Sequence, residues 1–188
     1  STFHFSAWLQ KTETQLPVRV PPASLVGRRV LVADDHAGTR EILEQMLGLA
    51  QMQVVSLAGG QMVQPTLVQA QTQGAPFDIC LIDLNMPDMN GYQVAESLRG
   101  ALEKPPYMIA LSSALERDAA KCDAAGFDGF QAKPVRRPRL VQMMGRLLGE
   151  GAKAKSPGDE EASRKMHTQY TVREAMKHSV SILLAEDN

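Results

Sequence analysis

The sequence predicts a doubly wound α/β fold, with a five-stranded parallel sheet formed between residues 28 and 149. Two observations lead to this expectation. Short apolar runs alternate with amphipathic stretches, which is the pattern of successive βα units. Acidic or polar residues also follow several of the apolar runs directly. Because right-handed crossovers bring the carboxyl ends of all parallel strands to one edge of a sheet, we expect those polar residues to meet there.

The predicted strands are short apolar runs, and the predicted helices are stretches in which apolar residues recur at intervals of three and four. The strands comprise Arg29–Ala33, Gln53–Leu57, Asp78–Ile82, Tyr107–Ser112 and Gly129–Ala132. The helices comprise Ala37–Leu49, Gln61–Thr72, Gly91–Leu102, Glu116–Ala125 and Pro138–Leu148. The apolar face of the first helix is expected to consist of Ile42, Leu43, Met46 and Leu47. Five βα pairs result.

Composition limits the class of protein. A chain of 188 residues with 44% hydrophobic content is long enough for one domain with appendages. Its net charge of −1 provides no basic field, so neither nucleic acid nor a membrane surface is an expected partner. No apolar run approaches the roughly 20 residues that span a bilayer, so we expect a cytoplasmic fragment. Cys80 and Cys122 lack metal-ligand spacing and are expected to be buried thiols.

Outside the βα block the composition changes. Residues 11–27 contain closely spaced prolines and are expected to form an extended linker. Residues 150–179 begin with small and charged residues and are expected to form a flexible linker. The segment Ser181–Asn188 repeats the form of Arg29–His36, with aliphatic residues, Ala, two acids and a polar residue. We therefore interpret residues 180–188 as the first strand of a second, truncated domain of the same type.

Functional side chains are expected at the carboxyl ends of the strands. These side chains are Asp34 and Asp35 after the first strand, Asp83 at the third, Ser112 at the fourth and Lys133 after the fifth. Three carboxylates within several Å would repel one another by about 4 kcal/mol per close pair at an effective dielectric constant near 20. A cation is therefore required, and ligands that are all oxygen atoms fit Mg²⁺.

This set of residues suits phosphoryl transfer to a carboxylate. Asp83 would be the nucleophile that attacks phosphorus, and Lys133 would neutralise charge on the transferring oxygens. Ser112 would donate its hydroxyl group to a phosphoryl oxygen. Asp34, Asp35 and Asp83 would hold the metal ion.

The block from Arg28 to Gly149 resembles the receiver domain of bacterial response regulators. The matching motifs are the acid pair in Leu31–Asp35, the loop Asp83–Gly91, then Ala110–Ser113, and Phe130–Pro134. The resemblance implies a flavodoxin-like (βα)5 domain at residues 28–149 with strand order 2-1-3-4-5. His36 and Ser112 stand where the family often has Asn and Thr, and we expect neither change to abolish the chemistry.

The resemblance also implies roles for individual residues. Asp83 is then the phosphoacceptor, and the backbone carbonyl of Asn85 joins the three carboxylates as a metal ligand. Ser112 and Phe130 form a switch pair, in which Phe130 turns inward when Ser112 moves toward the phosphoryl group. Lys133–Pro134 is expected to be a cis peptide bond that aims the lysine.

The start of the chain provides a context for this domain. Ser1–Leu9 resembles the closing strand of histidine-kinase ATP-binding domains, and we interpret residues 1–10 as the tail of such a domain. Kinase tail, receiver, linker and second receiver together imply a hybrid histidine kinase anchored in the bacterial inner membrane. The expected partners are the kinase core or a histidine phosphotransfer domain, and the following receiver in the same chain. The fragment itself is expected to be a phosphoacceptor with self-dephosphorylation.

Three other functions are compatible with parts of the pattern. A receiver-like docking module that is never phosphorylated usually lacks the acid pair, the acceptor or the lysine, and all of these are present here. An aspartyl-phosphate phosphohydrolase needs a second acid two residues after the nucleophile, where this chain has Asn85. A nucleotide-binding domain needs a glycine-rich turn after the first strand, which Asp34–Gly38 does not provide.

Overall fold

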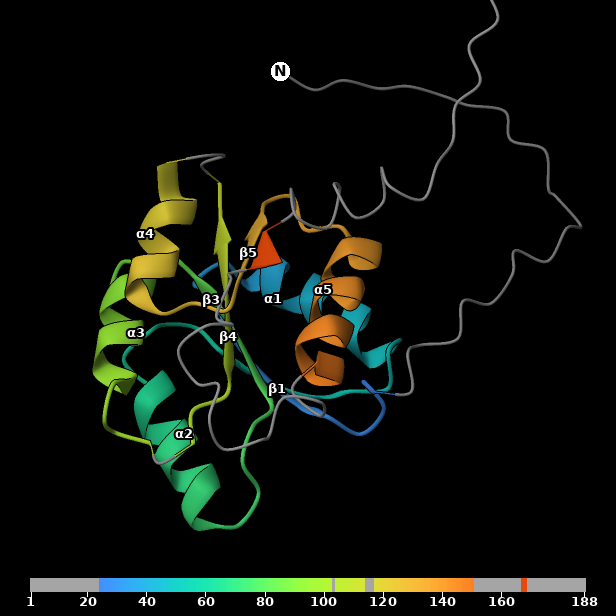
Figure 1. The fold of residues 1–188 in the computed structure, drawn as a ribbon, viewed down its shortest axis with the longest axis horizontal. Helices are drawn as coiled ribbons and strands as arrows, with labels where there is room; N and C mark the ends of the chain where they lie inside the picture. Colours follow the sequence, from blue (N-terminus) through green and yellow to red (C-terminus); the bar gives the residue numbers. More distant parts are fainter. Residues whose placement is uncertain (1–23, 103, 114–116, 151–166, 169–188) are drawn as a thin grey trace, which may run out of the picture.

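The computed structural model describes residues 24–102, 104–113, 117–150 and 167–168, which form a parallel sheet covered by helices on both faces (Figure 1). The strands are β1 Arg29–Ala33, β2 Gln53–Leu57, β3 Ile79–Asp83, β4 Tyr107–Ser112, β5 Gly129–Ala132 and β6 His167–Thr168. The helices are α1 Ala37–Gly48, α2 Val63–Thr72, α3 Gly91–Leu98, α4 Arg117–Ala125 and α5 Arg137–Glu150. The strand order is β2-β1-β3-β4-β5-β6.

The predicted fold is confirmed for the five βα units, whose strands have the order 2-1-3-4-5. The structure adds β6, which pairs in parallel with β5 inside the stretch where the sequence predicts a linker. Strand β3 begins one residue later than predicted, at Ile79. At this position the carboxylate of Asp78 accepts hydrogen bonds from the backbone N–H of Arg29 and from the side chain of Arg28, at 2.8 and 2.9 Å. The expectations for residues 1–23 and 169–188 lie outside the described residues.

The hydrophobic core consists of two layers separated by the sheet. Helices α2, α3 and α4 cover one face, and α1 and α5 cover the other (Figure 1). Strand β3 lies between β1 and β4, and all five of its residues are buried. Its side chains alternate between the two layers, since Cys80 and Ile82 belong to one core cluster and Ile79 and Leu81 to the other. The strand that carries Asp83 is thus fully enclosed.

The end of α3 differs most from the prediction, and the other helix boundaries lie within two residues of it. Helix α3 ends at Leu98, four residues early, because Arg99 has an extended backbone (ψ 118°) and Gly100 adopts φ +73°. Such a left-handed glycine commonly follows the last residues of a helix. Helix α2 begins at Val63 rather than Gln61, because the preceding residues form a turn in which the N–H of Val63 donates to the carbonyl of Gly60.

The predicted apolar face of α1 is wrong in one position. Leu43 and Leu47 are buried, whereas Ile42 is 52% exposed. Both thiols are buried as expected, and burial raises the pKa of the Cys80 thiol far above its ordinary value. A buried thiol of raised pKa is a poor nucleophile. Among the described residues, no helix is both long and apolar enough to cross a bilayer.

Replacing Leu81 with alanine should lower the free energy of unfolding by about 2–5 kcal/mol, because its fully buried side chain would leave a cavity in the α1/α5 layer. Val68→Ala is the matched control, since this valine of α2 is 38% exposed and its truncation should change stability by less than about 0.5 kcal/mol. Urea unfolding followed by circular dichroism measures both values. Equal losses in the two variants would contradict the assignment of Leu81 to the core.

Candidate functional site

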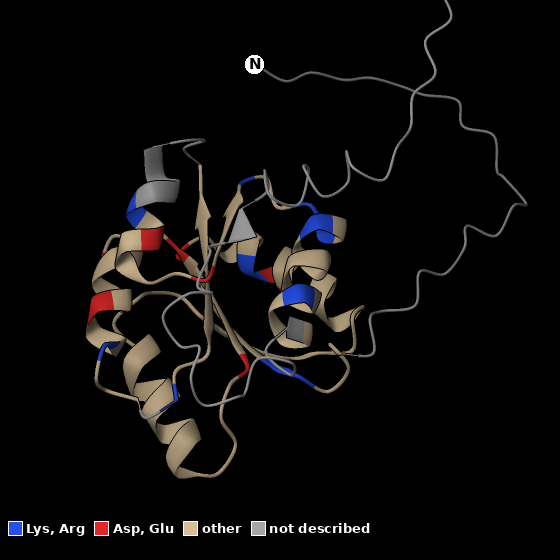
Figure 2. Ribbon diagram, in the orientation of Figure 1, with Lys and Arg blue, Asp and Glu red and all other residues tan. Residues whose placement is uncertain are grey.

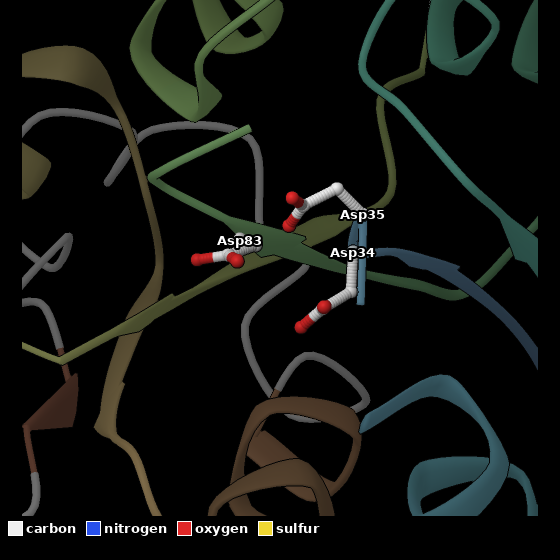
Figure 3. Close-up of side chains that lie close together, drawn as sticks. All are labelled: Asp34, Asp35 and Asp83. Carbon is white, nitrogen blue, oxygen red and sulfur yellow. The ribbon is translucent and has the colours of Figure 1, made fainter. Parts of the chain in front are cut away.

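Three carboxylates meet at the carboxyl edge of the sheet, as predicted. Asp34 and Asp35 follow β1, and Asp83 is the last residue of the neighbouring strand β3 (Figure 3). One oxygen of each carboxylate lies within 4.8 Å of the others, while Asp34 and Asp83 are buried and Asp35 is exposed. Acidic positions gather at this edge, and basic positions surround the start of α5 (Figure 2). The cluster thus has one open side, through Asp35.

The loop after β1 is held by backbone hydrogen bonds. Its Asp34 carboxylate accepts a 2.9 Å hydrogen bond from the N–H of His36. The guanidinium of Arg40 donates to the carbonyl groups of Asp34 and Asp35, at 2.8 and 3.0 Å. His36 itself caps α1, since its Nδ1 accepts a hydrogen bond from the N–H of Thr39 at 3.3 Å. His36 is exposed and lies outside the group of acids that could hold a metal ion.

Lys133 reaches the cluster from the end of β5. Its Nζ lies 2.8 Å from Oδ2 of Asp34 and 2.6 Å from Oδ2 of Asp83. Partial burial alone would lower the pKa of Lys133, but the hydrogen bonds and charges of the two carboxylates outweigh burial and raise it above the ordinary lysine value. The ammonium group is therefore charged at neutral pH, and it offsets one of the three negative charges. The Lys133–Pro134 peptide bond is cis, as the resemblance implies.

The loop after β3 begins with a close approach of two backbones. The N–H of Asn85 donates to Oδ1 of Asp83 at 3.2 Å, and the N–H of Leu84 donates to the carbonyl of Leu111 on β4. A Cβ atom on Gly91 would lie 2.8 Å from the carbonyl oxygen of Asp83 and 3.0 Å from the Cα of Leu84. Helix α3 can therefore begin beside Asp83 only because residue 91 has no side chain.

The proposed switch pair lies on the two strands beyond β3. Ser112 is the last residue of β4, is completely buried, and pairs in register with Ala132 of β5. Phe130 is also completely buried, within the core layer of α2, α3 and α4. Both side chains of the proposed switch pair are thus enclosed by the core.

Three residues that shape the site were not predicted from the sequence. Arg40 binds the carbonyl groups of the acid pair, Gly91 admits the start of α3, and Asp88 accepts backbone hydrogen bonds from the loop before α2. A glycine at the first position of a helix is a weak signal for close packing. Neither Arg40 nor Asp88 carries a sequence signal, because their partners are backbone groups that only the fold brings near.

The charge balance at the cluster favours a cation. Three carboxylates face one ammonium group, so two negative charges remain uncompensated among the described side chains in contact. Two of these carboxylates are almost fully buried, where removal from water makes unpaired charge costly. Carboxylate oxygens without nitrogen or sulfur ligands suit a hard divalent cation. Asp34, Asp35 and Asp83 are thus the residues that could hold a metal ion.

Comparison with known proteins connects this geometry to a family. Residues 30–145 match the family described as the response regulator receiver domain. Over 128 residues the chain is 30% identical to hybrid signal transduction histidine kinase L of Dictyostelium discoideum, an alignment that covers 65% of this chain and 7% of that protein. Over 154 residues it is 29% identical to the virulence sensor protein BvgS of Bordetella bronchiseptica, covering 78% of this chain and 12% of BvgS. The chain thus spans only a small part of the length of these relatives.

Solved structures share the architecture. The receiver domain of sensor histidine kinase PA1611 from Pseudomonas aeruginosa PAO1 is 27% identical, with a TM-score of 0.58 over 66% of this chain and 99% of that domain. That structure contains a magnesium ion coordinated in the active site cleft. The receiver domain of the histidine kinase CKI1 from Arabidopsis thaliana, in complex with Mg²⁺, is 25% identical, with a TM-score of 0.56 over 65% of this chain and 95% of that domain.

Replacing Gly91 with alanine should lower the free energy of unfolding by about 1–3 kcal/mol, because the new methyl group would collide with the backbone of Asp83 and Leu84. Gly48→Ala is the matched control. A Cβ atom there meets nothing within 4 Å, and alanine in α1 should raise stability by up to about 1 kcal/mol. Denaturant unfolding of both variants gives the comparison, and a Gly91→Ala protein as stable as wild type would contradict the close approach.

Proposed function

The chain belongs to the response regulator receiver family, and from this premise we propose that it accepts a phosphoryl group on Asp83 from a phosphohistidine, in a transfer that depends on Mg²⁺. The observation that supports the proposal best is the contact of Lys133 Nζ with Asp34 and Asp83, beside a third carboxylate from Asp35. This arrangement combines a nucleophile, a fixed positive charge and a set of oxygen ligands at one point of the sheet.

The proposed metal ligands are the carboxylates of Asp34, Asp35 and Asp83 with the backbone carbonyl of Asn85. The magnesium ion in the receiver of PA1611, which is 27% identical, supports the choice of this ion. When bound, Mg²⁺ would offset the carboxylate repulsion and supply positive charge to the oxygens of the incoming phosphoryl group. A side chain at position 91 would collide with the carbonyl group of Asp83 and so displace this part of the site.

In the proposed transfer, a carboxylate oxygen of Asp83 attacks phosphorus in line while the bond between phosphorus and the donor imidazole nitrogen breaks. The electron pair of that bond stays on the imidazole, and the phosphoryl group becomes an acyl phosphate on Asp83. Lys133 exchanges part of its contact with Asp83 for a phosphoryl oxygen and so stabilises charge on the transferring group. Ser112 donates its hydroxyl group to another phosphoryl oxygen.

Phosphorylation would then bias a two-state surface formed by α4, β5 and α5. Because Phe130 is completely buried in the core layer of α2, α3 and α4, we propose that the phosphoryl group stabilises the arrangement in which this side chain is enclosed. A hydrogen bond to the phosphoryl group would hold the Ser112 side chain away from Phe130. The buried position of Phe130 would then be populated for a larger fraction of the time. This is a shift of populations rather than the creation of a new conformation.

The wider context is part of the same proposal. Similarity to hybrid histidine kinases supports a receiver that exchanges phosphoryl groups with a kinase core or a histidine phosphotransfer domain. Residues 1–10 would be the end of a kinase ATP-binding domain, and residues 180–188 the first strand of a second receiver. A parent protein anchored in the bacterial inner membrane, with this domain in the cytoplasm, also stays a prediction.

Incubation with acetyl phosphate and Mg²⁺ should add the mass of one phosphoryl group to the protein, as measured by intact-protein mass spectrometry. The gain should disappear without Mg²⁺ and in Asp83→Asn, which keeps the size of the side chain but removes the nucleophilic oxygen charge. Asp78→Asn is a control, because this acid lies at the opposite end of β3 and should leave the mass gain unchanged.

A mass gain that persists in Asp83→Asn would move the acceptor to another residue. A wild-type protein that neither gains mass nor binds Mg²⁺ would contradict phosphoryl acceptance and favour a docking module that regulates the kinase core.

Phe130→Ala should accept the phosphoryl group at a rate within about threefold of wild type, because this side chain makes no contact with the reacting atoms in the proposed transfer. The conformational response of the surface formed by α4, β5 and α5 should be reduced, because the aromatic side chain of the switch pair is missing. Amide chemical-shift changes in α4, β5 and α5, measured by NMR with and without beryllofluoride, report this response. Complete loss of phosphorylation in a folded Phe130→Ala protein would assign Phe130 to the chemistry instead of the switch.

A further inference from the structure

We propose that Asp88 is a positioning residue for the metal and phosphoryl site, because its carboxylate ties the loop after β3 to the loop after β2. This inference rests on the proposed function, since the loop after β3 carries Asp83 and Asn85. Asp88 is not placed among the metal ligands. Its effect would be exerted through the backbone of the loop.

The tie consists of two charge-assisted hydrogen bonds. Oδ1 of Asp88 accepts from the backbone N–H of Gly60 at 3.2 Å, and Oδ2 accepts from the N–H of Gln61 at 3.1 Å. Slight desolvation would raise the pKa of Asp88, but hydrogen bonds from Gln61, Gly60 and Met89 outweigh it and lower the pKa. The carboxylate is therefore in its charged form at neutral pH, which is the stronger acceptor.

The loop after β2 is shaped to receive this carboxylate. A Cβ atom on Gly59 would lie 2.4 Å from Oδ2 of Asp88, and one on Gly60 would lie 2.3 Å from the carbonyl oxygen of Met89. Neither glycine has the left-handed backbone found at Gly74 or Gly100. Both are therefore needed for space rather than for conformational freedom. The two consecutive glycines allow the two loops to touch.

The same segment also contacts the first acid-bearing loop. The carbonyl of Leu57, at the end of β2, accepts a hydrogen bond from the N–H of Asp34 at 3.2 Å. Residues 57–61 thus join the loop that carries Asp34 and Asp35 on one side and, through Asp88, the loop that carries Asp83 on the other. A brace between the two loops sets the separation of their carboxylates, which a metal ion requires within a narrow range.

Other hydrogen bonds described for the loop between Asp83 and Gly91 stay close to its ends. Asn85 donates to Asp83, Gly91 donates to Leu84, and Asn90 exchanges hydrogen bonds with Gln93 in the capping box of α3. Those of Asp88 are the ones that fasten the middle of the loop to another element. Without them, Mg²⁺ would have to bind a less ordered loop, and ordering it would reduce the affinity.

The test is the dissociation constant of Mg²⁺, measured by isothermal titration calorimetry on Asp88→Ala, Gly59→Ala and the double variant. Gly59→Ala leaves Asp88 in the chain but displaces its carboxylate, which is the free end of a flexible side chain. Glu96→Ala is the control for loss of one negative charge, since Glu96 is exposed on α3. Thermal unfolding of each variant is measured in parallel, because a merely structural role would lower the melting temperature without changing the affinity of the folded protein.

Each single variant should bind Mg²⁺ about threefold to tenfold more weakly than wild type, a smaller effect than the loss of a direct partner of a metal ligand. The double variant should be no weaker than the weaker single variant, because both changes break the same tie. Glu96→Ala should bind like wild type. Rates of phosphorylation by acetyl phosphate should follow the affinities below saturating Mg²⁺ and recover when Mg²⁺ is saturating.

An increase of more than twofold in the dissociation constant of Mg²⁺ in both single variants supports the proposal. A smaller increase in either of them overturns it. If Asp88→Ala fails to fold, Asp88→Asn replaces it under the same criterion, since the amide keeps one acceptor oxygen and should give an intermediate affinity. If wild type binds Mg²⁺ and is phosphorylated, and the variants have the same Mg²⁺ affinity, this inference alone is refuted. Wild type that does neither refutes the proposed function, and the inference with it.

Discussion

Repulsion among three carboxylates is the constraint around which this domain is organised. Two of the three are buried, and the ammonium group of Lys133 contacts both of those at 2.6 and 2.8 Å. One positive charge cannot balance three negative ones, so these side chains leave an excess of negative charge that a divalent cation would relieve.

The scaffold that holds these charges is rigid for an ordinary reason. Strand β3 is buried along its whole length and lies between β1 and β4, so Asp83 is fixed at the end of a fully enclosed strand. Parallel strands bring the carboxyl ends of β1, β3 and β5 to one edge of the sheet. The charged side chains at those ends therefore meet there. Acids at the ends of packed strands lose little further entropy when a ligand binds.

The loops around the site and the core layer beside β4 and β5 contain the contacts that position its residues. Glycines at 59, 60 and 91 permit close approaches that side chains would prevent, and Asp88 and Arg40 fasten backbone segments that carry the acids. Phe130 of β5 is completely buried in the layer of α2, α3 and α4.

Much of this could be predicted from sequence because its signals are local. Alternating apolar and amphipathic segments predicted the five βα units, the resemblance to receiver domains implied their order, and acids placed at strand ends predicted the cluster of Asp34, Asp35 and Asp83, with Lys133 beside it. Tertiary structure alone decided the end of α3, the exposure of Ile42, the complete burial of Phe130 and the tie between Asp88 and the glycine loop. The physical reason is that periodicity and strand-end position are written in neighbouring residues, whereas hydrogen bonds to a distant backbone and the space for a side chain depend on groups that only the completed fold brings together.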